Sequence, residues 1–342
     1  MSSLSLLLSA ITLRLSAAAL RVTPSTPLSS PESYSVPCGS YGDLPTSAVA
    51  GCVPGSQGVP QCVRRLEDDF ASPAEVAQLR AMMNAGFARS RVSAGPTILD
   101  VNSGWLREAP RRVVNVYRND AATGEVALAF NASDLAMYGS IIERIRGAVA
   151  AAFGLSHLYL TTPTFVTRIR GDAGWSPADM HDEYYHPHVD MANTPRYQYS
   201  GLLYLSTAGE DFEGGAFAFL RKREGEEAVD DSAYGGGGPT EAEAVAEHVV
   251  LPRAGRLIVF SAGHENLHVV RRVESGERLV FSMWFTCQKE FEFSSFLDNR
   301  AHERVVAGGG GADKAAAGGA KRRRATRASR PPNVIKAAGD EL

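Results

Sequence analysis

The sequence lacks several features that would assign its class at once. Beyond residue 22 there is no stretch of 18 uninterrupted apolar residues, so no stable transmembrane helix is expected. Four cysteines in 342 residues are too few, and too irregularly spaced, for a zinc ribbon or finger. Residues 313–342 hold eight Lys/Arg and three Asp/Glu, which leaves the rest of the chain at −8 of the total net charge of −3. This body has no basic footprint, so no nucleic-acid partner is expected.

What is present is the composition of an ordinary globular protein. Hydrophobic residues make up 44% of the chain and charged residues 21%, which excludes a fibrous or wholly disordered protein. The length favours one large domain with appendages, and we expect that domain over residues 66–297.

Both ends of the chain carry features of targeting segments. Residues 1–22 contain a short apolar run and the small residues Ala17–Ala19, which fits a signal peptide; a short anchor, a transit peptide or a disordered start are the alternatives. Residues 298–342 form a basic, low-complexity tail that we expect to be disordered, and its end, Gly339–Leu342, resembles the KDEL retrieval signal with Gly in the first position. The two ends together predict the lumen of the endoplasmic reticulum, with a nuclear reading of the KRRR run as the alternative.

The cysteines fall into a local group and one remote residue. Cys38, Cys52 and Cys62 lie in residues 23–65, a segment rich in Pro, Gly and Ser that predicts a linker, whereas Cys287 lies far along the chain. The group fits either a disulfide staple or unpaired thiols in a flexible linker, and the pairing cannot be deduced from spacing.

Two segments have the apolar spacing of helices. The first begins with a capping box formed by Ser72 and Glu75, with Pro at the first helical position. The second is expected to begin at the cap Ser133 and to end before Gly154. Asn131 heads an N-glycosylation sequon that competes with this cap. Both helices are expected to pack on a sheet.

From Pro163 onward, short apolar runs alternate with turn residues, which is typical of an all-β sandwich or barrel. Residues 224–247 interrupt this pattern with eight acidic residues, no Lys or Arg, and four consecutive glycines. We expect this segment to be a solvated surface loop, with a binding role as the alternative. The runs that predict strands are TFVTRI, HPHVD, YSGLLYLS, GAFAFL, HVVL, RLIVFS, HVVRRV and RLVFSMWF.

One tripeptide has the spacing of a metal site. His188 and Asp190 are two residues apart in a predicted strand, so their side chains point to the same face. A third ligand from another strand would complete the two-His, one-carboxylate set that binds non-haem Fe(II). His268, in the run HVVRRV, is the candidate. The tripeptide alone is weak evidence and needs its partners.

The motifs in this order resemble Fe(II)- and 2-oxoglutarate-dependent dioxygenases of the prolyl 4-hydroxylase type. The phrases HDEYYHPHVD, SGLLYLS, EDFEGGAFAFL, AGRLIV and ENLHVVRRV are most similar to the branch named 2-oxoglutarate and iron-dependent oxygenase domain-containing proteins. The resemblance extends from about Leu66 to Cys287. It implies a mostly β protein with flanking helices, whose core is a double-stranded β-helix (jelly roll).

The resemblance also assigns roles to individual residues. It makes His188, Asp190 and His268 the iron ligands, and it makes Arg278 the partner of the distal carboxylate of 2-oxoglutarate. Many relatives have Lys at that position. A guanidinium among apolar neighbours needs a counter-ion, so the physical argument agrees. Tyr204 occupies the place of a hydroxyl that contacts the same carboxylate, although a Tyr in an LLYL strand is also an ordinary core residue.

Other histidines compete for these roles. Spacing alone favours His268 over His264 only slightly, and the ten-residue step from His268 to Arg278 in the resembled pattern strengthens that choice. His181 and His186 are expected to contact substrate, to support the ligands or to lie on the surface. The histidines without any supporting context are His157, His248 and His302.

The resemblance implies a hydroxylase of a protein side chain, prolyl before others, with Fe(II), 2-oxoglutarate and O2, and with ascorbate as a reductant. A basic peptide would complement the acidic loop. Two alternatives remain open: a zinc hydrolase on the same three ligands, which gives Arg278 no role, and a dioxygenase-like binding module without turnover. The sequence names neither the hydroxylated residue nor the oligomeric state.

Overall fold

The computed structural model of this chain describes residues 20–37, 61–108, 112–178, 184–222 and 244–293. Several expectations fall outside these ranges: the signal segment, the basic tail with its GDEL end, most of the acidic loop, Cys38, Cys52, His181 and His302.

The helical elements are few. The α-helices and 3-10 helices are α1 (Pro73–Phe87), α2 (Ala132–Phe153), α3 (Asp190–Asn193), η2 (His264–Asn266) and η3 (Lys289–Phe291).

Strands make up most of the described chain. They are β1 (Arg21–Thr23), β2 (Glu32–Pro37), β3 (Gln61–Glu67), β4 (Gly95–Asp100), β5 (Trp105–Glu108), β6 (Arg112–Asn115), β7 (Tyr159–Arg170), β8 (Tyr199–Tyr204), β9 (Phe212–Gly214), β10 (Phe217–Lys222), β11 (Ala244–Val250), β12 (Leu257–Ser261), β13 (His268–Val270) and β14 (Val273–Thr286).

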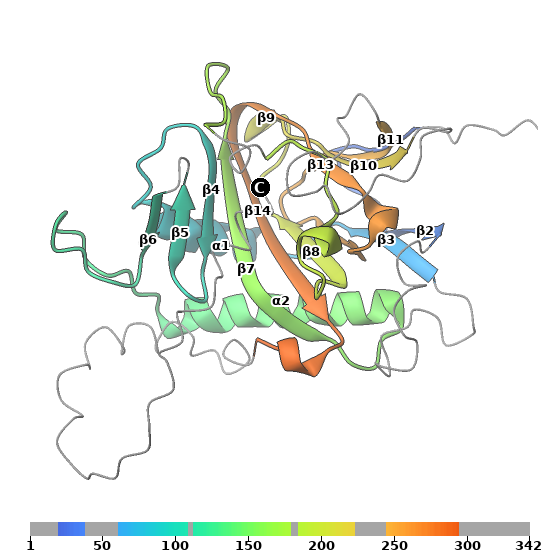
Figure 1. Cartoon of the computed structure of the whole chain (residues 1–342), viewed down its shortest axis with the longest axis horizontal. Coiled ribbons are helices and arrows are strands. Elements are labelled where there is room, and N and C mark those ends of the chain that lie inside the picture. The colour runs from blue at the N-terminus through green and yellow to red at the C-terminus, as the bar shows by residue number, and fades with distance from the viewer. Residues whose placement is uncertain (1–19, 38–60, 109–111, 179–183, 223–243, 294–342) are drawn as a thin grey trace, which may run out of the picture.

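The strands form two sheets that face each other. The large sheet has the order β2-β3-β12-β8-β14-β7-β4-β5-β6, with β9 paired to β14, and the small sheet has the order β1-β11-β10-β13. All pairings are antiparallel except that of β1 with β11. Figure 1 shows the small sheet on one side of β14 and the helix α2 on the other. The predicted jelly-roll architecture is confirmed.

The helices α1 and α2 cover the outer face of the large sheet. Their apolar stripes join the largest core cluster, which includes Leu79, Ile142 and Phe281. The predicted capping box at Ser72 is present, and α2 ends at Gly154 in the left-handed conformation. The start of α2 differs from expectation. Asn131 caps the helix by accepting a hydrogen bond from the Asp134 amide, because its carboxamide oxygen reaches that donor, while the Ser133 hydroxyl donates to the same oxygen.

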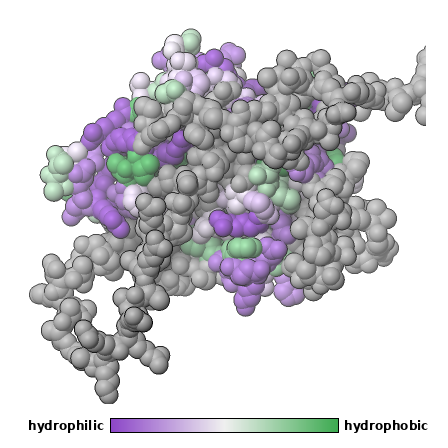
Figure 2. Space-filling model, in the orientation of Figure 1, coloured by the Kyte–Doolittle hydropathy of each residue, from purple (hydrophilic) through white to green (hydrophobic). Residues whose placement is uncertain are grey.

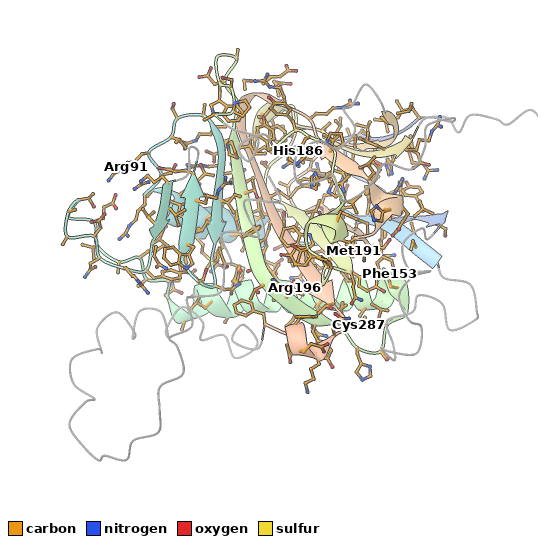
Figure 3. All side chains as sticks on the ribbon, in the orientation of Figure 1. Arg91, Phe153, His186, Met191, Arg196 and Cys287 are labelled. Atoms are coloured by element: carbon orange, nitrogen blue, oxygen red, sulfur yellow. The ribbon has the colours of Figure 1, made fainter. Side chains whose placement is uncertain are left out.

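The N-terminal segment that predicted a linker contributes strands instead. β2 pairs with β3 over residues 32–37, and β3 pairs with β12 in the large sheet. Pro, Gly and Ser in the intervening residues hid this pairing, because composition reports the average of a segment and not its ends. Cys62 on β3 and Cys287 after β14 are both buried and disulfide-bonded, so unpaired thiols are the wrong interpretation for these two residues. Figure 3 shows Cys287 on the α2 side of the large sheet.

Two further boundaries differ from the sequence analysis. β11 begins at Ala244, so the last four residues of the predicted acidic loop 224–247 belong to a strand of the small sheet. The strands β4, β5 and β6, which extend the large sheet beyond β7, were not predicted at all.

Hydrophobic residues on the described surface in Figure 2 lie in small separate groups among polar ones. No helix in the described ranges is long and apolar enough to cross a membrane.

Candidate metal centre

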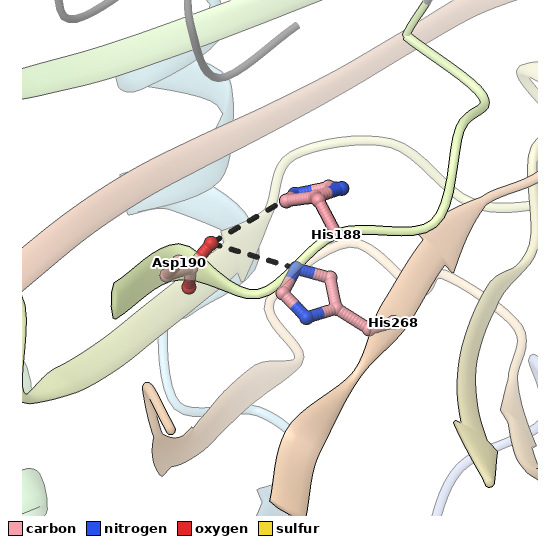
Figure 4. Close-up of side chains that lie close together, drawn as sticks. All are labelled: His188, Asp190 and His268. Carbon is pink, nitrogen blue, oxygen red and sulfur yellow. Dashed lines mark ion pairs between the residues drawn. The ribbon is translucent and has the colours of Figure 1, made fainter. Parts of the chain in front are cut away.

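Three of the residues singled out in the sequence meet between the two sheets. His188, Asp190 and His268 each offer one ligand atom, and these atoms lie within 4.8 Å of one another. Asp190 Oδ1 is 3.8 Å from His188 Nε2 and 3.6 Å from His268 Nε2 (Figure 4). Within the described part of the chain this is the one group of three such side chains that could hold a metal ion.

The local backbone explains why the two residues of the tripeptide face the same way. Val189 is extended, with φ −124° and ψ 125°, so the side chains on either side of it point in one direction. The expected regular strand is absent. His188 forms an isolated antiparallel bridge with His268, in which each backbone N–H donates to the other's carbonyl at 2.8 and 3.0 Å, and Asp190 begins the short helix α3.

Both imidazoles are oriented by backbone carbonyls. His188 Nδ1 donates to the His186 carbonyl at 3.1 Å, and His268 Nδ1 donates to the Asn266 carbonyl at 2.8 Å. These bonds direct each Nε2 at Asp190, which is the arrangement of a metal ligand. Burial, with the neighbouring His268 as a second cause, lowers the pKa of His188 to about 4, so this imidazole is neutral at pH 7.

Asp190 is held from the large sheet. Its second carboxylate oxygen, Oδ2, accepts a hydrogen bond from the Ser200 hydroxyl on β8, while Oδ1 faces the two histidines. Asp190 is 4% exposed and Ser200 is fully buried. Ser200 was missed in the sequence, where a Ser in the run YSGLLYLS carries no signal of its own.

The three residues line a pocket whose other walls are mostly apolar. Phe217 and Val270 come from the small sheet, and Ile169 and Trp284 from the large one. Arg278 on β14 is the cation of this pocket. It is 1% exposed, and its Nε donates to the Gly215 carbonyl at 3.0 Å. Gly215 has a φ of +60°, and a Cβ there would come within 3.0 Å of Arg278 Cδ.

Arg278 is a buried charge that has no counter-ion among the described residues. Among the described residues no carboxylate forms an ion pair with it, and burial lowers its pKa. Tyr204 lies beside it, with its ring centroid 5.3 Å from the guanidinium carbon. The Tyr204 hydroxyl is buried, and among the described groups it interacts only with the Arg278 side chain. Because buried polar groups are normally paired, both side chains are suited to an anionic ligand in the pocket.

None of the other described histidines belongs to the group formed by His188, Asp190 and His268, although His186 lies beside it. His264 is exposed at the start of η2, and His157 is exposed after α2. His186 lies near β13 (Figure 3), with its ring 5.5 Å from that of His188. His248 is buried on β11 and contacts Thr23 at 2.8 Å. The structure therefore separates His268 from its competitor His264.

Residues 176–286, which contain the three ligands and Arg278, match the model of the 2OG-Fe(II) oxygenase superfamily. This segment is a domain of that superfamily. "2-Oxoglutarate and iron-dependent oxygenase domain-containing protein 3" from Rattus norvegicus is 33% identical over 242 residues, which cover 70% of this chain and 66% of the relative. The protein of the same name from Homo sapiens is 32% identical over the same share of both chains. The chain thus spans about two thirds of the length of these curated relatives.

More distant oxygenases match shorter stretches. Prolyl 3-hydroxylase 1 from Rattus norvegicus is 29% identical over 165 residues, which cover 44% of this chain and 19% of that protein. A solved prolyl-4-hydroxylase from Pseudomonas putida is 19% identical and covers 65% of this chain and 91% of that one, with a TM-score of 0.37.

The donor set fits the metal and co-substrate in the superfamily's name. Two imidazoles and one carboxylate are the ligands of facial non-haem Fe(II) sites. The guanidinium of Arg278, in the same pocket, pairs with no described carboxylate and fits a ligand that carries a second carboxylate.

Proposed function

We propose that the protein is an Fe(II)- and 2-oxoglutarate-dependent dioxygenase that hydroxylates a protein side chain, with prolyl as the first candidate. The observation that carries this proposal is the convergence of His188, Asp190 and His268 in one pocket with Arg278, which forms no ion pair among the described residues. The balanced reaction is R–H plus O2 plus 2-oxoglutarate to R–OH plus succinate and CO2.

In this proposal His188, Asp190 and His268 hold the iron, and Arg278 binds the distal carboxylate of 2-oxoglutarate. The bound iron and 2-oxoglutarate supply the power to activate O2 and to oxidise a C–H bond. The chain's own residues orient the reactants. Gly215 fixes Arg278 through its carbonyl, and Ser200 fixes the carboxylate of Asp190. The apolar walls keep water out, which strengthens the charge pairing of Arg278 with a carboxylate.

A zinc hydrolase on the same three ligands is disfavoured by Arg278. A hydrolytic site needs no buried cation that waits for a carboxylate, and leaving one unpaired is unfavourable. A silent binding module is also disfavoured, since His188, Asp190, His268 and Arg278 all line this one pocket.

For the substrate we propose a peptide with basic residues near its hydroxylated side chain. The match to prolyl 3-hydroxylase 1 supports prolyl, and the eight acidic residues of 224–247 support basic neighbours. We expect ascorbate to serve as the reductant that keeps the iron in its Fe(II) state.

We also propose that the protein works in the lumen of the endoplasmic reticulum. The disulfide bonds of Cys62 and Cys287 support an oxidising compartment. A fluorescent fusion that leaves both termini free should colocalise with a lumenal marker, and a nuclear signal would contradict this proposal.

The experiment that tests the activity is succinate release by the full chain with Fe(II), 2-oxoglutarate and an array of peptides. Prolyl peptides with flanking Lys or Arg should raise succinate formation above the rate without peptide, and mass spectrometry should find a gain of one oxygen. Matched peptides with Ala in place of Pro are the control. A metal-dependent cleavage of the peptides without succinate would contradict the proposal and favour the hydrolase.

A further inference from the structure

Arg64, on the N-terminal strand β3, is buried close to the metal centre. It is 3% exposed, and its guanidinium has partners on two separate elements. Nε donates to Asn266 Oδ1 at 2.7 Å, Nη2 donates to the Glu265 carbonyl at 3.0 Å, and Nη1 pairs with Glu247 at 2.8 Å. Its flat face lies 4.2 Å from the Phe219 ring centroid. Arg64 therefore ties β3 to η2 and to β11.

The side chain of Asn266 is locked at both ends. Its oxygen accepts from Arg64, while its Nδ2 donates to the Ser261 carbonyl at 2.8 Å and to the Ser261 hydroxyl at 2.9 Å. Asn266 is 1% exposed, so water does not compete for these bonds. A residue fixed in this way has one backbone position, and its carbonyl has one direction.

That carbonyl is the acceptor for His268 Nδ1, at 2.8 Å. We propose that Arg64 is a positioning residue for the metal ligand His268, and that it acts through Asn266. This inference rests on the proposed role of His268 in binding iron. It adds that a residue of the N-terminal strand, outside the 176–286 segment that matches the superfamily, sets the affinity of the metal site.

Packing alone does not fix the imidazole. Phe217 stacks on the His268 ring at 5.0 Å and 28°, which sets the plane of the ring, and Phe260 contacts it at 5.3 Å and 68°. In that plane the ring could still be flipped by 180° about the Cβ–Cγ bond, and either nitrogen could carry the proton. The bond to the Asn266 carbonyl places the proton on Nδ1 and directs Nε2 at Asp190. Arg64 and Ser261 hold that carbonyl in place.

The test is the dissociation constant of Co(II), titrated calorimetrically into the metal-free full chain without 2-oxoglutarate. Arg64→Leu keeps the apolar stem and removes all three bonds, and we expect it to weaken Co(II) binding by about 10- to 100-fold. Arg65→Leu is the matched control, because Arg65 is the next residue on β3, is half-buried on the opposite face and pairs only with Glu67 in the described contacts. It should change the dissociation constant by less than about twofold.

A double-mutant cycle separates positioning from general destabilisation. Asn266→Ala should weaken Co(II) binding as Arg64→Leu does, and adding Arg64→Leu to Asn266→Ala should give little further loss, because the route through Asn266 is already broken. If the two losses multiply instead, Arg64 does not act through Asn266 and the proposal is wrong. An unchanged Co(II) affinity in Arg64→Leu would also overturn it.

Should Arg64→Leu fail to fold, Arg64→Lys decides. It keeps a positive charge opposite Glu247, but a single ammonium cannot serve both Asn266 and Glu265. We expect it to fold and to lose at least about fivefold in Co(II) affinity, and wild-type affinity would contradict the proposal. His268→Ala distinguishes this failure from that of the proposed function: if that variant binds Co(II) as wild type does, His268 is no ligand and the error lies in the metal site itself.

Discussion

His188 and His268 face the same oxygen of Asp190, but their surroundings differ. His268 stands on β13, stacked on Phe217, and its Nδ1 bonds to a carbonyl that Arg64 and Ser261 hold in place. His188 stands on a one-residue bridge, and 12% of its side chain is exposed, against 5% for His268.

The comparison teaches how a rigid ligand set is assembled from unequal parts. In the bridge between His188 and His268, each backbone N–H donates to the partner residue's carbonyl. The bridge therefore holds His188 in a fixed position relative to the more buried His268. Ser200 then fixes Asp190 from the large sheet. One well-held histidine and two short connections position all three ligands.

The largest effect on metal binding is expected at Asp190, the residue that both histidines face. Asp190→Ala removes the only anionic ligand, so Co(II) affinity should fall by more than the about 10- to 100-fold expected for Arg64→Leu, and succinate formation should stop. His264→Ala, in the exposed turn beside His268, should leave Co(II) binding unchanged. Full activity of Asp190→Ala, or loss of the metal in His264→Ala, would show that the ligand set is wrong.

The next effect concerns Arg278, which lines the same pocket but is not one of the three residues that could hold a metal ion. Arg278→Ala should raise the KM for 2-oxoglutarate by about 10- to 100-fold, since a charge-assisted pair of about 1.5–3 kcal/mol is lost. The Co(II) affinity measured without 2-oxoglutarate should stay the same. Arg278→Lys should lose less, because the charge remains. An unchanged KM in Arg278→Ala would return Arg278 to a structural role.

A smaller effect tests the connection to the large sheet. Ser200→Ala removes the hydrogen bond to Asp190 Oδ2 and should weaken Co(II) binding by about tenfold, without the loss seen in Asp190→Ala. Titration calorimetry under the same conditions measures it. If the variant binds Co(II) like wild type, Asp190 is positioned by helix α3 and by its histidine neighbours alone.

The smallest effect is a pH dependence of the free energy of unfolding, which comes from His248 on β11 of the small sheet. Burial lowers the pKa of His248 to about 4, from 6.5 in the unfolded chain. The unfolded state therefore binds the proton first, and this residue lowers the free energy of unfolding as the pH falls from about 6.5 to 4, by on the order of 1 kcal/mol at pH 5.5 and 3 kcal/mol at pH 4. Asp100, whose pKa burial raises to about 6, acts oppositely over about pH 4–6.

Urea unfolding of wild type and His248→Gln between pH 5 and 7.5 isolates the His248 contribution, because Asp100 is common to both. As the pH falls, the free energy of unfolding of wild type should decrease relative to that of the variant. A difference independent of pH would mean that His248 is protonated in the fold or accessible to water.

How far the sequence could predict this site depends on the distance over which each contact forms. His188 and Asp190 were accessible from a two-residue period, since Val189 is extended even without a regular strand. His268 and Arg278 needed the order of motifs along the chain, because nothing local distinguishes His268 from His264. The fold class followed from the strand runs between 163 and 286.

The rest could not be predicted, because it depends on contacts between separate elements, which for Arg64 and Asn266 lie 202 residues apart. Arg64 meets Asn266 only because β3 pairs with β12, and the Pro- and Gly-rich surroundings of β3 concealed that strand. Ser200 is one small residue in an apolar run, and its partner is known only once β8 lies beneath Asp190. Hydrogen bonds between distant elements leave no periodic signal in the sequence.

The central claim is that His188, Asp190 and His268 hold the metal and that Arg278 receives the second carboxylate of 2-oxoglutarate. Anomalous diffraction at the nickel edge, from crystals of the full chain grown with Ni(II) and 2-oxoglutarate, tests it directly. The account predicts an anomalous peak bounded by the two Nε2 atoms and Asp190 Oδ1, with a carboxylate of the co-substrate against Arg278. A peak at His264 or His186 in place of His268, or density for 2-oxoglutarate that leaves Arg278 unpaired, would contradict it.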